Sequence, residues 1–125
     1  MPFTSRDRRN GALWEAVTAS TDIRDWTEGK MLSDYTGDTL LRSAIERQFG
    51  VFTRSIRIAA QQDESLRDDM PRLSEVIGLG EALADRYDET DHEAIWSAIT
   101  VDFPMIRARI VDVLGEEDDS SFACV

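Results

Sequence analysis

The segment DTLLRSAIERQFGVFTRSIRIAAQ, from Asp38 to Gln61, carries the clearest structural signal in the chain. Its apolar side chains recur every three or four residues, the spacing that places them on one face of an α-helix. That face contains Leu41, Ile45, Gln48, Phe52, Ile56 and Ala59, flanked by Leu40, Ala44, Phe49 and Ser55. A carboxylate just before such a face accepts hydrogen bonds from the first free backbone N–H groups. We therefore predict a helix from Thr39 to about Gln61, capped by Asp38.

Helical periodicity extends to the rest of the chain. We predict a first helix from about Arg8 to Trp26, another from Ser74 to about Tyr87, and a last one that starts at a Thr90 or Asp91 cap. The apolar face of this last helix contains Ile95, Trp96, Ile99, Phe103, Ile106, Ile110 and Val113, and Pro104 should kink it. The stretches MLSDYTGD (31–38) and DESLRDDMP (63–71) are predicted to be connections. No alternating pattern typical of strands is present, so the fold class is an all-α bundle of four or five helices.

The length of 125 residues predicts a single domain. We place it at residues 1–115, followed by an acidic tail at 116–125 that we expect to be frayed. A single cysteine, Cys124, and the lack of a long apolar run favour a reduced, cytoplasmic protein without membrane attachment.

Charge argues against general nucleic-acid binding. The chain has 14 basic and 25 acidic residues, a net charge of −11, which repels phosphate backbones. A local exception is a group of four arginines in the central helix, Arg42, Arg47, Arg54 and Arg57. These either form charge pairs on the helix face or contact phosphate.

Familiar catalytic patterns are missing from the sequence. The single histidine, His92, lies beside Asp91 and Glu93, which is typical of a solvated surface imidazole. There is no zinc-ligand spacing, no phosphate-binding glycine loop and no nucleophile elbow. The acidic clusters are typical of solvated turns, so we expect no metal and no cofactor.

Three segments in order resemble one family. Asp38 to Phe52, DTLLRSAIERQFGVF, resembles a helix that reads D-x-x-x-x-x-A-[IV]-x-R-x-[LF]-x-[IV]-[IL] in the HepT-like toxins. MPRLSEVIGLGEALADRY (70–87) resembles the segment P-x-[IL]-x-x-x-x-[IM]-G-x-R-N-x-[IL]-x-H-x-Y, and TDHEAIWSAITVDFPMIRARI (90–110) is similar to the closing helix with its W-to-DFP spacing. These toxins are small HEPN-domain proteins encoded beside minimal nucleotidyltransferases.

The resemblance implies an antiparallel, up-and-down helical bundle that forms a homodimer with a ribonuclease site at the dimer cleft. The family signature is R-x-x-x-x-H-x-Y. Its histidine handles the proton of the RNA 2′-hydroxyl, and its arginine stabilises charge on the phosphorus-bound oxygens. The resemblance also implies a nucleotidyltransferase antitoxin as partner, which in the family transfers AMP to the signature tyrosine.

The two chemical residues of that signature are absent here. The alignment places Gly80 at the arginine and Asp85 at the histidine, with Glu81 at the neighbouring asparagine and Tyr87 at the tyrosine. A glycine holds no charge, and a carboxylate is a poor base for a hydroxyl and repels phosphate. We therefore predict no ribonuclease activity, and Tyr87 is either a nucleotidylation site or a packed helix-end aromatic.

Two alternatives stay open. One is a metal-independent ribonuclease toxin with an atypical site, in which Arg47, Arg54 and Arg86 contact RNA phosphates and Asp85 acts as base. The other is a repurposed helical module that binds another protein or a small ligand.

Overall fold

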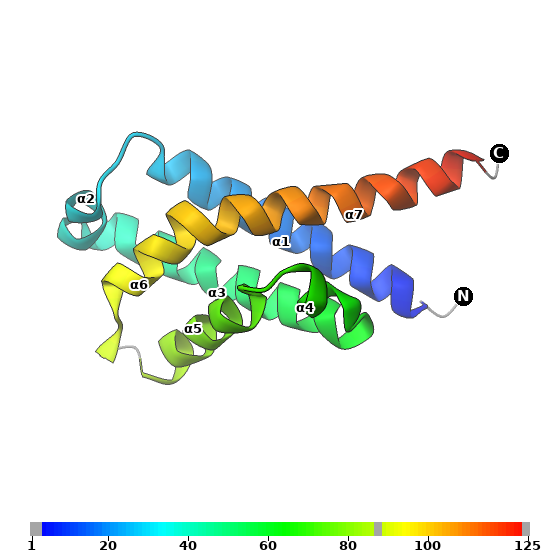
Figure 1. Cartoon of the computed structure of the whole chain (residues 1–125). Coiled ribbons are helices and arrows are strands. Elements are labelled where there is room, and N and C mark those ends of the chain that lie inside the picture. The colour runs from blue at the N-terminus through cyan, green and yellow to red at the C-terminus, as the bar shows by residue number, and fades with distance from the viewer. Residues whose placement is uncertain (1–3, 87–88, 124–125) are drawn as a thin grey trace.

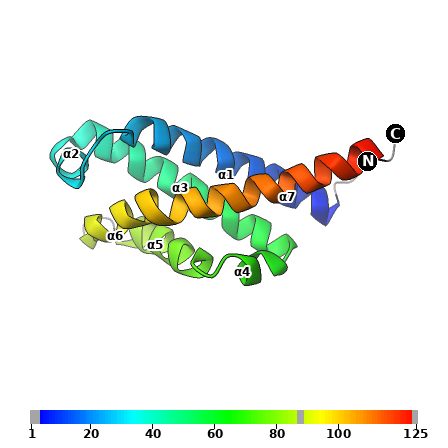
Figure 2. The same ribbon diagram turned by 45° about the horizontal axis from the view of Figure 1, so that its top comes forward.

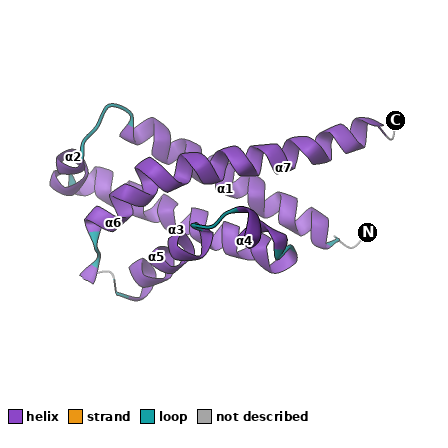
Figure 3. Ribbon diagram, viewed as in Figure 1, coloured by secondary structure: helices purple, strands orange, loops and turns teal. Residues whose placement is uncertain are grey.

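The structure is a computed structural model. It describes the backbone of residues 4–86 and 89–123, and the side chains of these residues up to Gly115. Helices make up nearly all of this part of the chain, and it contains no strand, so the all-α prediction is confirmed (Figure 3). None of these helices combines the length and the apolar character that crossing a membrane requires.

Four helical arms run alternately up and down (Figure 1). The first is α1 (Ser5–Thr27), the second α3 (Thr39–Gln62) and the third α5 (Leu73–Asp85). The fourth is continuous through α6 (His92–Ser97), the π-helical turn η2 (Ala98–Asp102) and α7 (Phe103–Ala123). Two short helices, α2 (Leu32–Gly37) and α4 (Ser65–Asp69), lie in the connections on either side of α3.

The predicted central helix is the centre of the bundle. α3 packs against α1 on one side and α5 on the other, and α7 crosses α1, as the turned view also shows (Figure 2). Phe49 and Phe52 of α3 are fully buried and stack on Phe103 of α7, with ring centroids 5.2 and 4.0 Å apart. Aromatic stacking adds to the area that these rings bury, so α3 is joined to the fourth arm as well.

Both predicted helix caps are confirmed. The Asp38 carboxylate accepts a hydrogen bond from the Leu41 N–H at 3.1 Å, and the Asp91 carboxylate accepts one from the Ala94 N–H at 3.0 Å. These caps fix where α3 and α6 begin, because they satisfy N–H groups that have no partner within the helix.

The connection predicted at residues 31–38 is wrong in detail, since it contains α2. Tyr35 of this helix is completely buried, and its ring stacks on Trp96 of α6 at a centroid distance of 5.6 Å. A six-residue helix is not stable by itself. It forms here because a tertiary contact holds it, which local periodicity does not reveal. The predicted connection at 63–71 likewise contains α4.

Where the sequence predicts a kink at Pro104, the structure has the π-helical turn η2 in the residues just before it, and α7 follows directly. Proline has no N–H to donate to the preceding turn. In the turn just before it, the Phe103 N–H bonds to the Ala98 carbonyl, five residues back, so the helical path widens and continues. α7 extends to Ala123, and the domain boundary at residue 115 stays a prediction.

Candidate functional site

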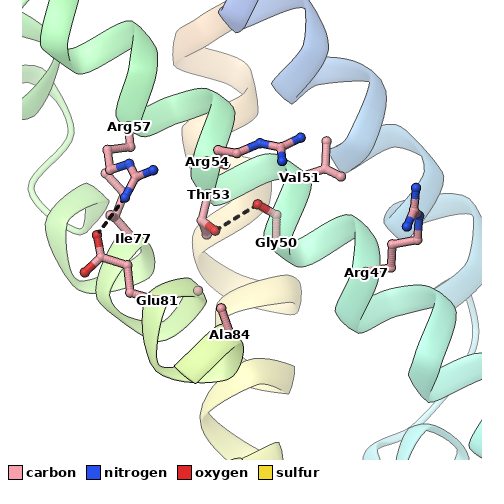
Figure 4. Close-up of a pocket in the computed structure, with 10 residues that line it drawn as sticks. Arg47, Gly50, Val51, Thr53, Arg54, Arg57, Ile77, Glu81 and Ala84 are labelled. Carbon is pink, nitrogen blue, oxygen red and sulfur yellow. Dashed lines mark hydrogen bonds and ion pairs between the residues drawn. The ribbon is translucent and has the colours of Figure 1, made fainter. Parts of the chain in front are cut away.

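Two positions of the degenerate signature line the same groove as three of the four arginines of the central helix. This groove, about 380 Å³ in volume, lies between α3 and α5 (Figure 4). Arg47, Arg54 and Arg57 line it from α3, and Gly80 and Glu81 line it from α5. Residues that the sequence singled out for two separate reasons are therefore neighbours.

Gly80 marks the closest approach of the two helices. It is buried, and a Cβ atom built on it would lie 2.6 Å from the Thr53 Cβ and closer still to the Thr53 hydroxyl. Thr53 is itself 5% exposed and donates a hydrogen bond to the Gly50 carbonyl of its own helix at 3.3 Å. The position aligned with the family's catalytic arginine therefore has no room for a side chain in this packing.

The groove is electrostatically mixed. Arg57 Nη1 lies 3.5 Å from Glu81 Oε1, and both side chains are about half exposed (43% and 55%). Arg47 and Arg54 are exposed and form no ion pair with any residue that the structure describes. Part of the arginine charge is thus neutralised within the protein, and part of it faces solvent.

Other residues singled out from the sequence lie elsewhere. Asp85 is the exposed last residue of α5 and does not line the groove. Arg86 follows it and pairs with Glu89 at 4.0 Å, at the edge of a different hollow. Arg42 donates to the Thr36 carbonyl at 2.7 Å and is directed away from the groove residues. Tyr87 lies outside the described residues.

A buried polar cluster was missed by the sequence analysis. The Tyr35 hydroxyl donates to Oε1 of Glu46, which is 5% exposed, at 3.1 Å. His92 Nδ1 lies 3.4 Å from that hydroxyl and 3.6 Å from the same carboxylate oxygen. The His92 side chain is 37% exposed, so the expected surface imidazole also contacts this cluster. The one available signal was a glutamate between apolar positions of the central helix.

The aspartate of the DFP segment has a structural partner. Asp102 is 6% exposed, and its two carboxylate oxygens each lie 3.4 Å from the guanidinium of Arg72, which precedes α5. Hydrogen bonding and charge from Asp102 raise the pKa of Arg72, and Glu75 adds to this. This pair ties the start of α5 to η2 and thereby helps to fix the groove.

Among the described residues, no group of three or more His, Cys, Asp or Glu side chains is arranged to hold a metal ion. The charged side chains that line the groove are arginines and one glutamate. A guanidinium forms bidentate hydrogen bonds with phosphate or carboxylate groups.

Comparison with models of known families matches residues 17–113 to the family described as ribonuclease HepT-like. No curated protein and no solved structure matches the chain significantly. The matched range runs from within α1 into α7 and includes the whole groove, in agreement with the resemblance found in the three sequence segments. The chain therefore belongs to the ribonuclease HepT-like family.

Proposed function

We propose that this HepT-like protein does not cleave RNA and acts by binding, as the cytoplasmic homodimeric partner of a nucleotidyltransferase antitoxin. The observation that carries the proposal is the packing of Gly80 against Thr53. In the family the aligned arginine stabilises negative charge on the phosphorus-bound oxygens, and such stabilisation is a large part of catalysis. In this protein residue 80 is buried, and the space that its side chain would need is occupied by Thr53 of α3.

The residues at the other positions of the signature support the same proposal. Asp85 replaces the histidine and is exposed at the end of α5. Glu81 is directed to Arg57. Two carboxylates in place of an imidazole and an amide oppose the approach of a phosphate and supply no good proton acceptor for a 2′-hydroxyl. A nucleotidylated tyrosine would not be needed to silence such a site.

Cleavage assays test the loss of activity directly. The purified full-length protein is incubated with single-stranded RNA in the presence of a metal chelator, and we expect intact RNA. Metal-independent cleavage that is lost in Asp85→Ala would contradict the proposal and would favour the atypical ribonuclease. The observation that favours this second candidate is the pair of arginines, Arg47 and Arg54, that have no ion pair with described residues.

Purification from the native host tests the partner. We expect a nucleotidyltransferase to co-purify and the HepT-like chain to behave as a dimer in light scattering. Intact-mass analysis of the same sample reports whether Tyr87 carries AMP. Dimers without a nucleotidyltransferase would instead support the repurposed binding module, and a strict monomer at high concentration would contradict the assembly.

A further inference from the structure

A second hollow, about 400 Å³ in volume, lies between the C-terminal half of α1 and the arm formed by η2 and α7. Toward the end of the bundle that carries α2, α1 and α7 diverge, as both views show (Figures 1 and 2). The hollow lies between these diverging segments, and its described lining residues are all different from those of the groove between α3 and α5. Its volume is within the range of small-molecule sites, which often lie between the helices of a bundle.

The floor of this hollow is apolar. It consists of Ile23, Ile99 and Phe103, which are 1%, 5% and 3% exposed, and these three side chains are named the apolar floor below. On the α7 side, the exposed Pro104 and Ala108 continue the apolar surface toward solvent. A hydrocarbon chain laid on this surface is removed from water, which favours its binding.

The hydroxyl groups that line the hollow have already used their protons. Ser20, Thr27 and Thr100 each donate a hydrogen bond to a backbone carbonyl of their own helical turn, at 2.9, 2.7 and 2.9 Å. These side chains therefore do not supply hydrogen-bond donors to a ligand. Recognition of a polar group is left to the charged side chains at the rim.

Two guanidinium groups stand on the two walls of the hollow, Arg24 on α1 and Arg107 on α7. Arg107 Nε donates to the Thr21 hydroxyl at 3.3 Å, and Arg107 forms no ion pair within the described part of the chain. Arg24 Nε lies 3.5 Å from the carboxylate of the adjacent Asp25, and both side chains are more than half exposed, so this pair is weak. Both arginines can donate charge-assisted hydrogen bonds to an anion.

The size and charge of the hollow limit the class of anion. Its α1 wall extends from Ser20 to Glu28, a rise of about 12 Å along the helix, which is the scale of a medium-length alkyl chain. Glu28 adds one negative charge to the lining and so opposes a doubly charged group such as a phosphate monoester. A single carboxylate matches the planar fork of a guanidinium.

From these features we infer that the hollow binds an aliphatic carboxylate of the medium-chain fatty acid class, with its chain on the apolar floor and its carboxylate between Arg24 and Arg107. This binding site is separate from the proposed function. It requires neither RNA nor a nucleotidyltransferase, so RNA cleavage by the protein would contradict the proposed function and leave the site unaffected.

Isothermal titration calorimetry on the full-length protein at low salt tests the inference. The probes are acetate, octanoate, decanoate and octanol. We expect octanoate to bind and decanoate to bind about fivefold to tenfold more tightly, because two more methylene groups are buried. Octanol, which lacks the charge, should bind about tenfold more weakly than octanoate, and acetate, which lacks the chain, should not bind.

Arginine variants locate the carboxylate. Arg24→Ala and Arg107→Ala should each weaken decanoate binding about tenfold, the usual effect of losing a charge-assisted contact. Arg107→Lys should retain part of the affinity. Arg8→Ala is the matched control, because Arg8 is exposed on the same helix, roughly 24 Å from Arg24, and its loss changes the net charge equally. Circular dichroism confirms that each variant is folded.

A blocking substitution locates the chain. Ala108→Phe places a ring over the hollow from an exposed position and should abolish decanoate binding. Met105→Phe is its control, because Met105 is 67% exposed on the same helix and does not line the hollow. No binding of decanoate, equal binding of octanol and octanoate, arginine variants that bind like Arg8→Ala, or an Ala108→Phe variant that binds like Met105→Phe would each overturn the inference.

Discussion

Gly80 of α5 lies against Thr53 of α3 at a separation that excludes any side chain larger than hydrogen. A Cβ on Gly80 would be 2.6 Å from the Thr53 Cβ. A Cβ on Gly78, two residues earlier on the same helix, would meet no neighbouring atom within 4 Å. Successive helical residues are rotated by about 100°, so the two glycines lie on nearly opposite faces of α5. One glycine is required by packing and the other is not.

This contrast gives a matched pair of substitutions. Gly80→Ala should lower the free energy of unfolding by about 1–3 kcal/mol, since overpacking forces α5 away from α3. Gly78→Ala should raise it by about 0.5–1 kcal/mol, because alanine is the better helix former and meets no neighbour. Chemical denaturation measures both. Equal effects of the two variants would contradict the close approach.

Rebuilding the family signature should fail for the same steric reason. Asp85→His is tolerated because residue 85 is exposed, whereas Gly80→Arg introduces a long charged side chain at a buried contact. We expect the double variant to be strongly destabilised and to leave RNA intact, as judged by thermal unfolding and a cleavage assay. A stable double variant that cleaves RNA would show that position 80 has room for an arginine side chain.

The long helices were predictable because each carries its own periodic apolar face and, for α3 and α6, its own cap. The arginine group was only partly predictable. Arg47 and Arg54, seven residues apart, share a face. Arg42 precedes Arg47 by five residues and is rotated by about 140° from it, so it bonds to Thr36 instead of lining the groove.

Contacts between distant segments were not predictable from local pattern. Tyr35 and His92 meet Glu46 only because α2 and α6 both close against α3. The same holds for Gly80, whose alignment position was known from the sequence but whose contact with Thr53 depends on how α3 and α5 cross. The spacing of residues along the chain predicts which of them share one face of a helix. Which other helix packs against that face is decided by the tertiary structure.

The free energy of unfolding should depend on the hydrogen bond that the Tyr35 hydroxyl donates to the buried carboxylate of Glu46. Tyr35→Phe keeps the ring that stacks on Trp96 and removes the hydroxyl that donates to Glu46 Oε1. Because the other oxygen, Oε2, is buried without a hydrogen-bond partner among the described residues, the change should cost about 1–3 kcal/mol of unfolding free energy. The cost should shrink in a Glu46→Gln background, measured as a double-mutant cycle. An additive cycle would contradict the coupling.

At acid pH the free energy of unfolding should depend on the protonation of Asp63. This residue follows α3, and its carboxylate pairs with Arg9 near the start of α1. Hydrogen bonds from Ser65, and then the Arg9 guanidinium at 2.9 Å, lower the pKa of Asp63. A carboxyl whose pKa is lower in the folded state stabilises the fold above its unfolded pKa, and this stabilisation is lost as the pH falls through the folded pKa.

Asp63→Asn removes this contribution and should cost about 1 kcal/mol near neutral pH, a value expected for a partly exposed pair whose side chains are 12% and 28% exposed. Urea denaturation of both proteins from about pH 7 to about pH 2 measures the difference as a function of pH. The difference should be constant down to about pH 4 and then shrink, because protonation of Asp63 makes the natural protein resemble the variant. Arg9→Gln is the control that removes the guanidinium and keeps the Ser65 hydrogen bonds, so its pH dependence should lie between the two. A difference that stays constant to the lowest pH would mean that the Asp63 carboxylate is not stabilised in the fold.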